Sequence, residues 1–283
     1  MTTPLLKWLG GKTQLLPQVL SHFPTQIRNY VEPFVGGGSI LFEVCSRVQK
    51  GEIELHGKIT AYDKNPILIQ FYQHVQSEPL RIYEDAHQLQ TVYNELGEKE
   101  KETYYYSIRD QFNKEPLGTQ KKSVLFLFLN KTCFRGVYRE GPHGFNVPFG
   151  HYKTVNIVDR EHLLRVSSLL QSVTFVCQDF TQLFTKGWSK RDFIYFDPPY
   201  VPEEEKSFTQ YTVDGFKKEQ HILLFDWCKN LKQAGIPFLL SNSNTELVRE
   251  HFPISSFTLL QVGAKRSIHS KRPQTTTVEL FIK

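Results

Sequence analysis

Five short apolar runs, each ending in glycine or polar residues, predict buried β-strands along the chain. They are YVEPFVGGG, KITAYDKN, SVTFVCQDF, DFIYFDPPY and IPFLLSNSN. Apolar residues at helical spacing follow the first run in SILFEVCSRV and precede the last in EQHILLFDWCKNLKQAG. Strands that alternate with helices predict an α/β fold with a mainly parallel sheet. Near the C-terminus, SSFTLLQVGA and QTTTVELFIK flank a basic loop and predict a β-hairpin.

The alternation is interrupted once, between about Pro66 and Arg160. The segments TYYYSIRDQF and KKSVLFLFLNKTCF predict helices there, and sequence rich in basic residues and glycine follows them. The pattern therefore predicts two domains. Residues 1–65 and 161–283 form the first, and residues 66–160 are a second module inserted between its second and third strands.

The charge balance permits a polyanionic partner without requiring one. The chain has 34 basic and 29 acidic residues, a formal net charge of +5. The basic residues are unevenly distributed, however. Between Lys114 and Lys153, seven basic residues are opposed by two acidic ones. This segment is a candidate surface for phosphates.

Several classes of protein are disfavoured by the composition. The four cysteines are far apart and form no C-x-x-C pair, which argues against a structural zinc site and a disulfide framework, and fits a reducing compartment. No H-E-x-x-H motif occurs, no apolar run approaches the ~20 residues of a membrane helix, and the N-terminus lacks a signal pattern. We expect a soluble intracellular protein without a metal or a membrane anchor.

The N-terminal segment LLKWLGGKTQLL looks like the end of a phosphate-binding P-loop. That motif needs a glycine six residues before its lysine and a strand leading into it. Here the lysine is Lys12 and the residue six positions earlier is Leu6. The segment therefore needs another explanation.

The ends of the predicted strands carry candidate ligand groups. In open α/β sheets, ligands bind beyond the carboxyl ends of the strands. The first strand leads into Gly36, Gly37 and Gly38, the second ends at Asp63 and the third at Asp179. Taken singly, a glycine turn can be purely structural and an aspartate can cap a helix. Three such ends in succession favour a nucleoside-like ligand.

The fourth strand ends in FDPPYV, the most informative segment of the chain. Asp197 offers carboxylate acceptors, while Pro198 and Pro199 fix φ and remove two backbone donors. Tyr200 then supplies an aromatic face. This combination suits an amino group held between acceptors while its ring stacks on tyrosine; the alternative is a plain proline turn that leaves a strand.

Four motifs together resemble the Dam-like, D12-class DNA adenine methyltransferases. They are KWLGGK, FVGGGS, DPPY and GFNVPFGHYK, and they occur in the family's order over nearly the whole chain. The resemblance implies a Rossmann-like methyltransferase sheet that binds S-adenosylmethionine, with a mainly helical target-recognition module inserted in it. It also implies site-specific methylation of the 6-amino group of adenine in double-stranded DNA, with Asp197, Pro198, Pro199 and Tyr200 as catalytic residues.

The resemblance also assigns residues to the cofactor. Trp8 and Lys12 would contact the methionine end, Asp63 the ribose hydroxyls and Asp179 the adenine amino group. On pattern alone, Trp8 would be a core aromatic. The complete set of expected cofactor-binding residues is Trp8, Lys12, Phe34, Gly36, Gly37, Gly38, Ser39, Asp63, Asp179, Phe180 and Asp197.

Part of the inserted module resembles a hairpin that reads DNA sites containing the bases GAT, such as GATC, from the major groove. Phe134 matches an intercalating aromatic residue, Arg139 a guanine-reading arginine and Pro148 a residue that contacts a thymine methyl group. Arg135 departs from the asparagine of many GATC enzymes, which leaves the target open, and Arg139 could instead bind phosphate. The expected DNA-binding residues are Lys131, Phe134, Arg135, Arg139, Asn146, Pro148, Tyr152, Lys153, Lys265, Arg266, Lys271 and Arg272. The last four are phosphate contacts or an exposed hairpin tip.

Methylation of a stacked adenine requires the base to be flipped out of the duplex. The segment VPEEEKSFTQYT resembles the family's mobile loop, in which Phe208 and Tyr211 would close over the base, whereas Glu203, Glu204 and Glu205 would be solvated. The resemblance allows a cognate restriction endonuclease as a functional partner. Two alternatives remain: an amino-group methyltransferase for RNA or protein glutamine, and a non-catalytic DNA-binding relative. Glutamine enzymes usually carry asparagine in place of Asp197, and a non-catalytic relative would show damaged motifs.

Overall fold

The structure is a computed structural model of the chain, and it describes residues 2–202, 216–265 and 276–283. The expected loop residues Glu203, Glu204, Glu205, Phe208 and Tyr211, and the basic residues Arg266, Lys271 and Arg272, lie outside the described residues. The chain divides into two compact units, which are described separately. The first comprises residues 1–11, 36–46 and 63–177, and the second comprises residues 12–35, 47–62 and 178–283.

The second unit contains a mostly parallel sheet. Strands β2, β4, β8 and β9 are parallel, and β11 pairs antiparallel with both β9 and β10, in the order β10-β11-β9-β8-β2-β4. Strands β1 and β3 pair in parallel and form a separate two-stranded sheet. The bounds are β1 Gln26–Ile27, β2 Tyr30–Glu32, β3 Glu54–Leu55, β4 Ile59–Asp63, β8 Phe193–Phe196, β9 Phe238–Ser243, β10 Leu259–Lys265 and β11 Thr276–Ile282. The parallel sheet and the C-terminal hairpin predicted from the sequence are confirmed.

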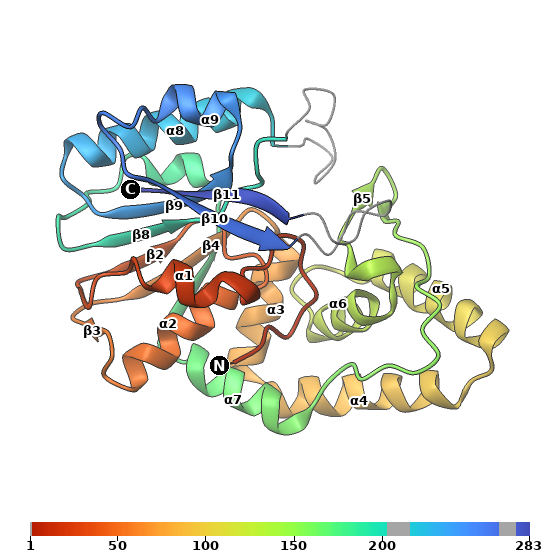
Figure 1. Ribbon diagram of the computed structural model, residues 1–283. Helices are drawn as coiled ribbons and strands as arrows, with labels where there is room; N and C mark the ends of the chain where they lie inside the picture. The colour runs from red at the N-terminus through yellow and green to blue at the C-terminus, as the bar shows by residue number, and fades with distance from the viewer. Residues whose placement is uncertain (1, 203–215, 266–275) are drawn as a thin grey trace. The chain divides into compact units, whose positions relative to one another are not determined.

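Helices cover this sheet, which explains its apolar strands. All four residues of β8 and all six of β9 are buried, as expected for strands packed on both faces. Helices α8 and α9 lie on one face of the sheet (Figure 1). The helical segments of this unit are η1 Thr13–Leu15, α1 Leu16–Leu20, η3 Phe180–Leu183, α8 Lys218–Gln233 and α9 Glu246–His251.

The first unit is mainly helical, with α6 as its central element. Helix α6 contacts α3, α4 and α5, and every residue from Ser123 to Asn130 is buried. A helix that is apolar on all sides fits this position. The elements of this unit are α2 Ser39–Gln49, whose last turn lies beyond it, α3 Pro66–Ser77, α4 Pro79–Glu95, α5 Glu98–Lys114, α6 Gln120–Thr132, η2 Phe134–Gly136, β5 Glu140–Gly141, β6 Gly144–Phe145, α7 Arg160–Leu170 and β7 Val173–Cys177.

These elements confirm the strands and helices predicted from the apolar pattern. The two units are defined by how compactly the chain folds and not by function. The predicted division into a recognition module, residues 66–160, and a catalytic domain therefore stays a prediction. Within the described parts of the chain, no helix is both long and apolar enough to cross a membrane.

Candidate active site

The glycine turn after β2 fits closely against Trp8. Gly36 and Gly38 have φ values of +48° and +74°, which glycine adopts without strain. A Cβ atom at Gly36 would lie 2.9 Å from Cδ1 and Nε1 of Trp8, and one at Gly37 would lie 2.8 Å from the Trp8 Cβ. The turn therefore needs glycine because an indole lies directly on its backbone. The Trp8 ring also stacks on Tyr138, with ring centroids 6.1 Å apart.

Asp63 holds the same turn in place. Its Oδ2 accepts a hydrogen bond from the Gly36 N–H at 3.1 Å, and its Oδ1 accepts one from the Asn65 N–H at 2.9 Å. The Tyr72 hydroxyl donates to the Gly36 carbonyl at 2.9 Å. Burial raises the pKa of Asp63 to about 6, although the backbone N–H donors act in the opposite direction. Buried Ser39 begins α2 directly after the turn.

Asp197 follows β8 in the second unit and is paired with Lys12. The Lys12 Nζ lies 2.7 Å from the Asp197 Oδ1, and the two side chains are 3% and 19% exposed. Burial raises the pKa of Asp197 to about 6; the Lys12 ammonium lowers it, and the charge of Glu279 adds to the increase. The lysine of the GGKT segment is therefore bound to a carboxylate in this structure.

Tyr200 and the residue after it are fixed by the end of β9 and by the middle of β11. The Tyr200 hydroxyl donates to Glu279 Oε2 at 2.7 Å. The Val201 N–H donates to Asn242 Oδ1 at 3.1 Å, and the Ser243 hydroxyl donates to the Val201 carbonyl at 2.6 Å. Before it, Pro198 is buried and Pro199 is partly exposed. The DPPYV segment thus has a defined position on the sheet.

A second carboxyl group, that of Glu32, lies at the end of β2; the sequence pattern places it at a strand end but gave it no role in the site. Glu32 is 2% exposed and accepts a hydrogen bond from the Tyr30 hydroxyl at 2.9 Å. Burial raises the pKa of Glu32 well above its ordinary value, and the charge of Asp197 contributes. A protonated Glu32 is favoured for this reason. The feature of the sequence that points to Glu32 is its position at the end of a strand, immediately before Pro33.

Asp179 caps a helix, as a lone aspartate at a strand end often does. Its Oδ1 accepts hydrogen bonds from the Thr181 N–H at 3.0 Å and from the Thr181 hydroxyl at 2.8 Å. The next residue, Phe180, packs on Phe34 with ring centroids 5.3 Å apart, and Phe216 lies against both rings. The roles of Asp179, Phe34 and Phe180 toward a cofactor stay predictions.

A short β-hairpin is present in the first unit where the DNA-reading hairpin was expected, and its contact with DNA stays a prediction. Strands β5 and β6 pair antiparallel, and Arg139 precedes β5. Its Nε donates to Asn146 Oδ1 at 2.7 Å. This hydrogen bond orients a side chain that remains exposed at the surface. Two of the expected DNA-binding residues therefore contact one another.

An exposed aromatic residue and a strained arginine lie next to each other in η2. The Phe134 side chain is 48% exposed, and its N–H donates to the Pro148 carbonyl at 2.9 Å. Arg135 has a φ of +58°, and its guanidinium lies 5.1 Å from the Phe134 ring centroid. A non-glycine residue in the left-handed region costs roughly 1–3 kcal/mol and is typical of functional sites.

Two lysines of the first unit, Lys7 and Lys131, interact with each other. The Lys7 Nζ donates to the Lys131 carbonyl at 3.2 Å and lies 4.2 Å from the ring centroid of Tyr152. Burial and the Lys7 charge lower the pKa of Lys131 to about 8. Lys153 is exposed, and Lys265 ends β10, where its backbone alone is described. Lys7 and Lys131 thus bring positive charge together in the first unit, and the binding of DNA by these lysines stays a prediction.

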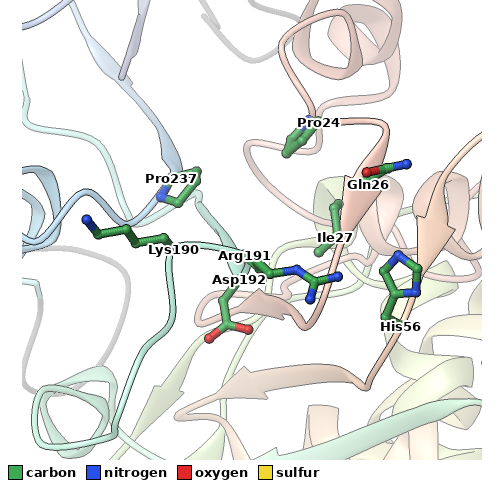
Figure 2. Close-up of a pocket in the computed structure, with 8 residues that line it drawn as sticks. All are labelled: Pro24, Gln26, Ile27, His56, Lys190, Arg191, Asp192 and Pro237. Carbon is green, nitrogen blue, oxygen red and sulfur yellow. The ribbon is translucent and has the colours of Figure 1, made fainter.

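A cavity of about 200 Å³ lies at the other end of the strands. Figure 2 shows Asp192, which precedes β8, and Pro237, which precedes β9, among its lining residues. The Asp192 carboxylate accepts hydrogen bonds from Arg28 and Asn29. Because ligands of such sheets bind at the carboxyl ends, this cavity is not the candidate active site. In the described part of the chain, no group of three or more His, Cys, Asp or Glu residues is placed to hold a metal ion.

Comparison with known proteins identifies the family. A family model for D12 class N6 adenine-specific DNA methyltransferases matches residues 8–268. The chain is 37% identical to the type II methyltransferase M.MjaIII of Methanocaldococcus jannaschii, over 95% of this chain and 93% of that protein. It is 33% identical to the DNA adenine methylase of Haemophilus influenzae, over 96% and 89% of the two chains. The chain belongs to the D12 class of N6 adenine-specific DNA methyltransferases.

Proposed function

We propose that this enzyme transfers a methyl group from S-adenosylmethionine to the 6-amino group of a flipped adenine in double-stranded DNA, at GATC or another GAT-containing site. The observation that carries the proposal is the cluster at the end of β8. There, Asp197 is ion-paired with Lys12, and Tyr200 is fixed by Glu279. A carboxylate acceptor and an aromatic face are thus held together at the carboxyl end of β8.

Asp197 supplies the acceptor for the amino group. The lone pair of that nitrogen is delocalised into the purine ring, so the nitrogen is a weak nucleophile. Hydrogen bonds from its two N–H groups, one to the ionised Asp197 carboxylate and one to the Pro198 carbonyl, draw the nitrogen toward tetrahedral geometry. Because these groups are fixed before the substrate arrives, the catalysis is mainly orientation and electrostatics.

The residues expected at S-adenosylmethionine fit its chemistry. The cofactor supplies an activated methyl group on a sulfonium. In the first unit, the Trp8 ring lies on the Gly36–Gly37 turn, and Asp63 offers carboxylate oxygens suited to ribose hydroxyls. In the second unit, Asp179 offers an acceptor for an adenine amino group, and the Phe34 and Phe180 rings form an apolar surface.

The free-energy cost of flipping the target base out of the duplex must be offset by contacts in the site. Flipping costs a few kcal/mol, and stacking of the base on Tyr200 returns ~1–3 kcal/mol. Residues 66–160 are the proposed recognition module that reads the bases. In it, Asn146 orients Arg139, and the exposed Phe134 ring could insert between bases. Residues 1–65 and 161–283 then form the catalytic domain. A cognate restriction endonuclease is a further proposal, supported by relatives named as type II methyltransferases.

The test is methylation of DNA by the purified protein with labelled S-adenosylmethionine, followed by sequencing of modified bases. We expect N6-methyladenine at one short sequence that contains GAT. Asp197→Ala should reduce the rate by at least about 100-fold with unchanged circular dichroism. Methylation of RNA or of protein glutamine in place of DNA would refute the proposal, as would a folded Asp197→Ala variant with full activity.

A further inference from the structure

Tyr200 is held from three directions by residues distant in sequence. Its backbone continues into Val201, which Asn242 and Ser243 bind at the end of β9. Its hydroxyl donates to Glu279, and the Lys12 Nζ lies 4.7 Å from its ring centroid. A phenol ring whose adjoining backbone and hydroxyl are both held has little freedom to tilt.

Glu279 is well placed to fix that tip. It lies on β11, between β9 and β10, and pairs with Ser243 on one side and Val262 on the other. Its backbone is therefore fixed by the sheet. Because Ser243 also binds Val201, the two strands that hold the Tyr200 backbone and the Tyr200 hydroxyl are directly hydrogen-bonded to each other.

A charged acceptor at this position has an electrostatic cost. The titratable groups that interact electrostatically with Asp197 are Lys12 from the start of η1, Glu32 from β2, Tyr195 from β8, Tyr200 and Glu279 from β11. Glu279 raises the pKa of Asp197, which opposes the ionised form that the proposed reaction requires. The hydrogen bond to the phenol gives a reason for a glutamate here despite that cost.

We propose that Glu279 is a positioning residue for methyl transfer, which orients the Tyr200 ring against the target adenine through the phenol hydroxyl. The inference rests on the proposed function, since it requires that the base stack on Tyr200. It assigns a role to the C-terminal hairpin in the catalytic step. Glu279 itself touches neither the base nor the methyl donor in this account.

The experiment compares Glu279→Leu, Glu279→Gln and Tyr200→Phe, together with a double variant that combines Glu279→Leu with Tyr200→Phe, on one methylated duplex at saturating cofactor. At pH 8, we expect Glu279→Leu and Tyr200→Phe each to lower kcat by about 3- to 10-fold, the equivalent of one hydrogen bond. The double variant should lose no more than either single variant. Glu279→Gln keeps an acceptor oxygen and should retain the wild-type kcat at pH 8.

The pH profile supplies a readout that a purely structural role would leave unchanged. Glu279→Gln removes a negative charge near Asp197, so the acidic limb of its kcat profile should move to lower pH. Val278→Ala, a change at an exposed position of the same strand, is the control for general damage to the hairpin. Should Glu279→Leu fail to fold, Glu279→Asp, with a carboxylate one methylene shorter, takes its place with the same expectation.

The outcomes separate the two proposals. A wild-type protein that methylates no DNA refutes the proposed function, and this inference with it. A wild-type protein that methylates DNA while Glu279→Leu matches it overturns the positioning role alone. So does a double variant whose losses multiply, or an acidic limb that does not move in Glu279→Gln.

Discussion

Lys12 and Asp197 form an ion pair, with the lysine Nζ 2.7 Å from the aspartate Oδ1, and the same ammonium group lies 4.7 Å from the ring centroid of Tyr200. One buried cation thus contacts both the proposed acceptor carboxylate and the proposed stacking ring. Its charge lowers the pKa of Asp197 against the effect of burial. This lysine, Lys12, belongs to the GGKT segment, which looks like the end of a P-loop.

This pair predicts the pH dependence of methylation. The pKa of Asp197 is raised to about 6, and the ionised form is the proposed acceptor. Activity should therefore be lost as the pH falls through about 6. Lys12→Met removes the group that lowers this pKa, so the acidic limb should move to higher pH, whereas Lys12→Arg should keep it near the wild-type position. The measurement is kcat against pH at saturating cofactor and DNA; coincident limbs for Lys12→Met and wild type would contradict the role of the pair.

Tyr200→Ala should weaken the complex with the flipped base. The loss of base stacking is expected to cost ~1–3 kcal/mol, while Tyr200→Phe keeps the ring and should retain most of that stacking. A duplex with 2-aminopurine at the target position reports flipping by its fluorescence. Equal fluorescence for Tyr200→Ala and wild type would mean that the base stacks on another residue.

Arg139 distinguishes base reading from phosphate binding. If its guanidinium makes two hydrogen bonds to a guanine, Arg139→Ala should lose ~1–3 kcal/mol of discrimination at one base pair. Methylation would then spread to duplexes altered at that pair. Rates are measured on duplexes substituted one pair at a time, at two salt concentrations. A uniform loss on all duplexes with a shallower salt dependence would assign Arg139 to phosphate and favour Arg135 as the reader.

Gly37→Ala tests the packing of the glycine turn on Trp8. The added Cβ would lie 2.8 Å from the Trp8 Cβ, and such overpacking typically costs ~1–3 kcal/mol. Binding of S-adenosylmethionine should weaken as the turn shifts. Gly187→Ala is the matched control, because a Cβ there meets nothing within 4 Å. Urea unfolding and calorimetric titration with the cofactor give the two quantities, and a Gly37→Ala variant equal to Gly187→Ala in both would refute the close fit.

The apolar pattern predicted the strands well because buried parallel strands are apolar on both faces. Runs such as FIYF of β8 have no polar positions to confuse with a half-exposed strand or an amphipathic helix. The ends of such strands are also visible in the sequence, so Asp63, Asp179 and Asp197 could be singled out. Helix α6 was predicted from its long apolar run, although its central place among α3, α4 and α5 required the structure.

The contacts that complete the candidate site could not be predicted in the same way. Glu279 reaches Tyr200 because β11 pairs with β9, and an antiparallel pairing of strands distant in sequence leaves no local signal. The Lys12–Asp197 ion pair likewise joins opposite parts of the chain. The left-handed φ of Arg135 was hidden because arginine rarely adopts it.

The stacking of Trp8 on Tyr138 limits how the proposed recognition hairpin can be exchanged. The same indole lies on the backbone of Gly36 and Gly37, at the turn proposed to bind the cofactor. A chimera that replaces residues 133–148 to change the DNA sequence read would also replace one neighbour of that indole. Such chimeras should therefore keep an aromatic residue at position 138. Without it, we expect the change of DNA specificity to be accompanied by weaker cofactor binding.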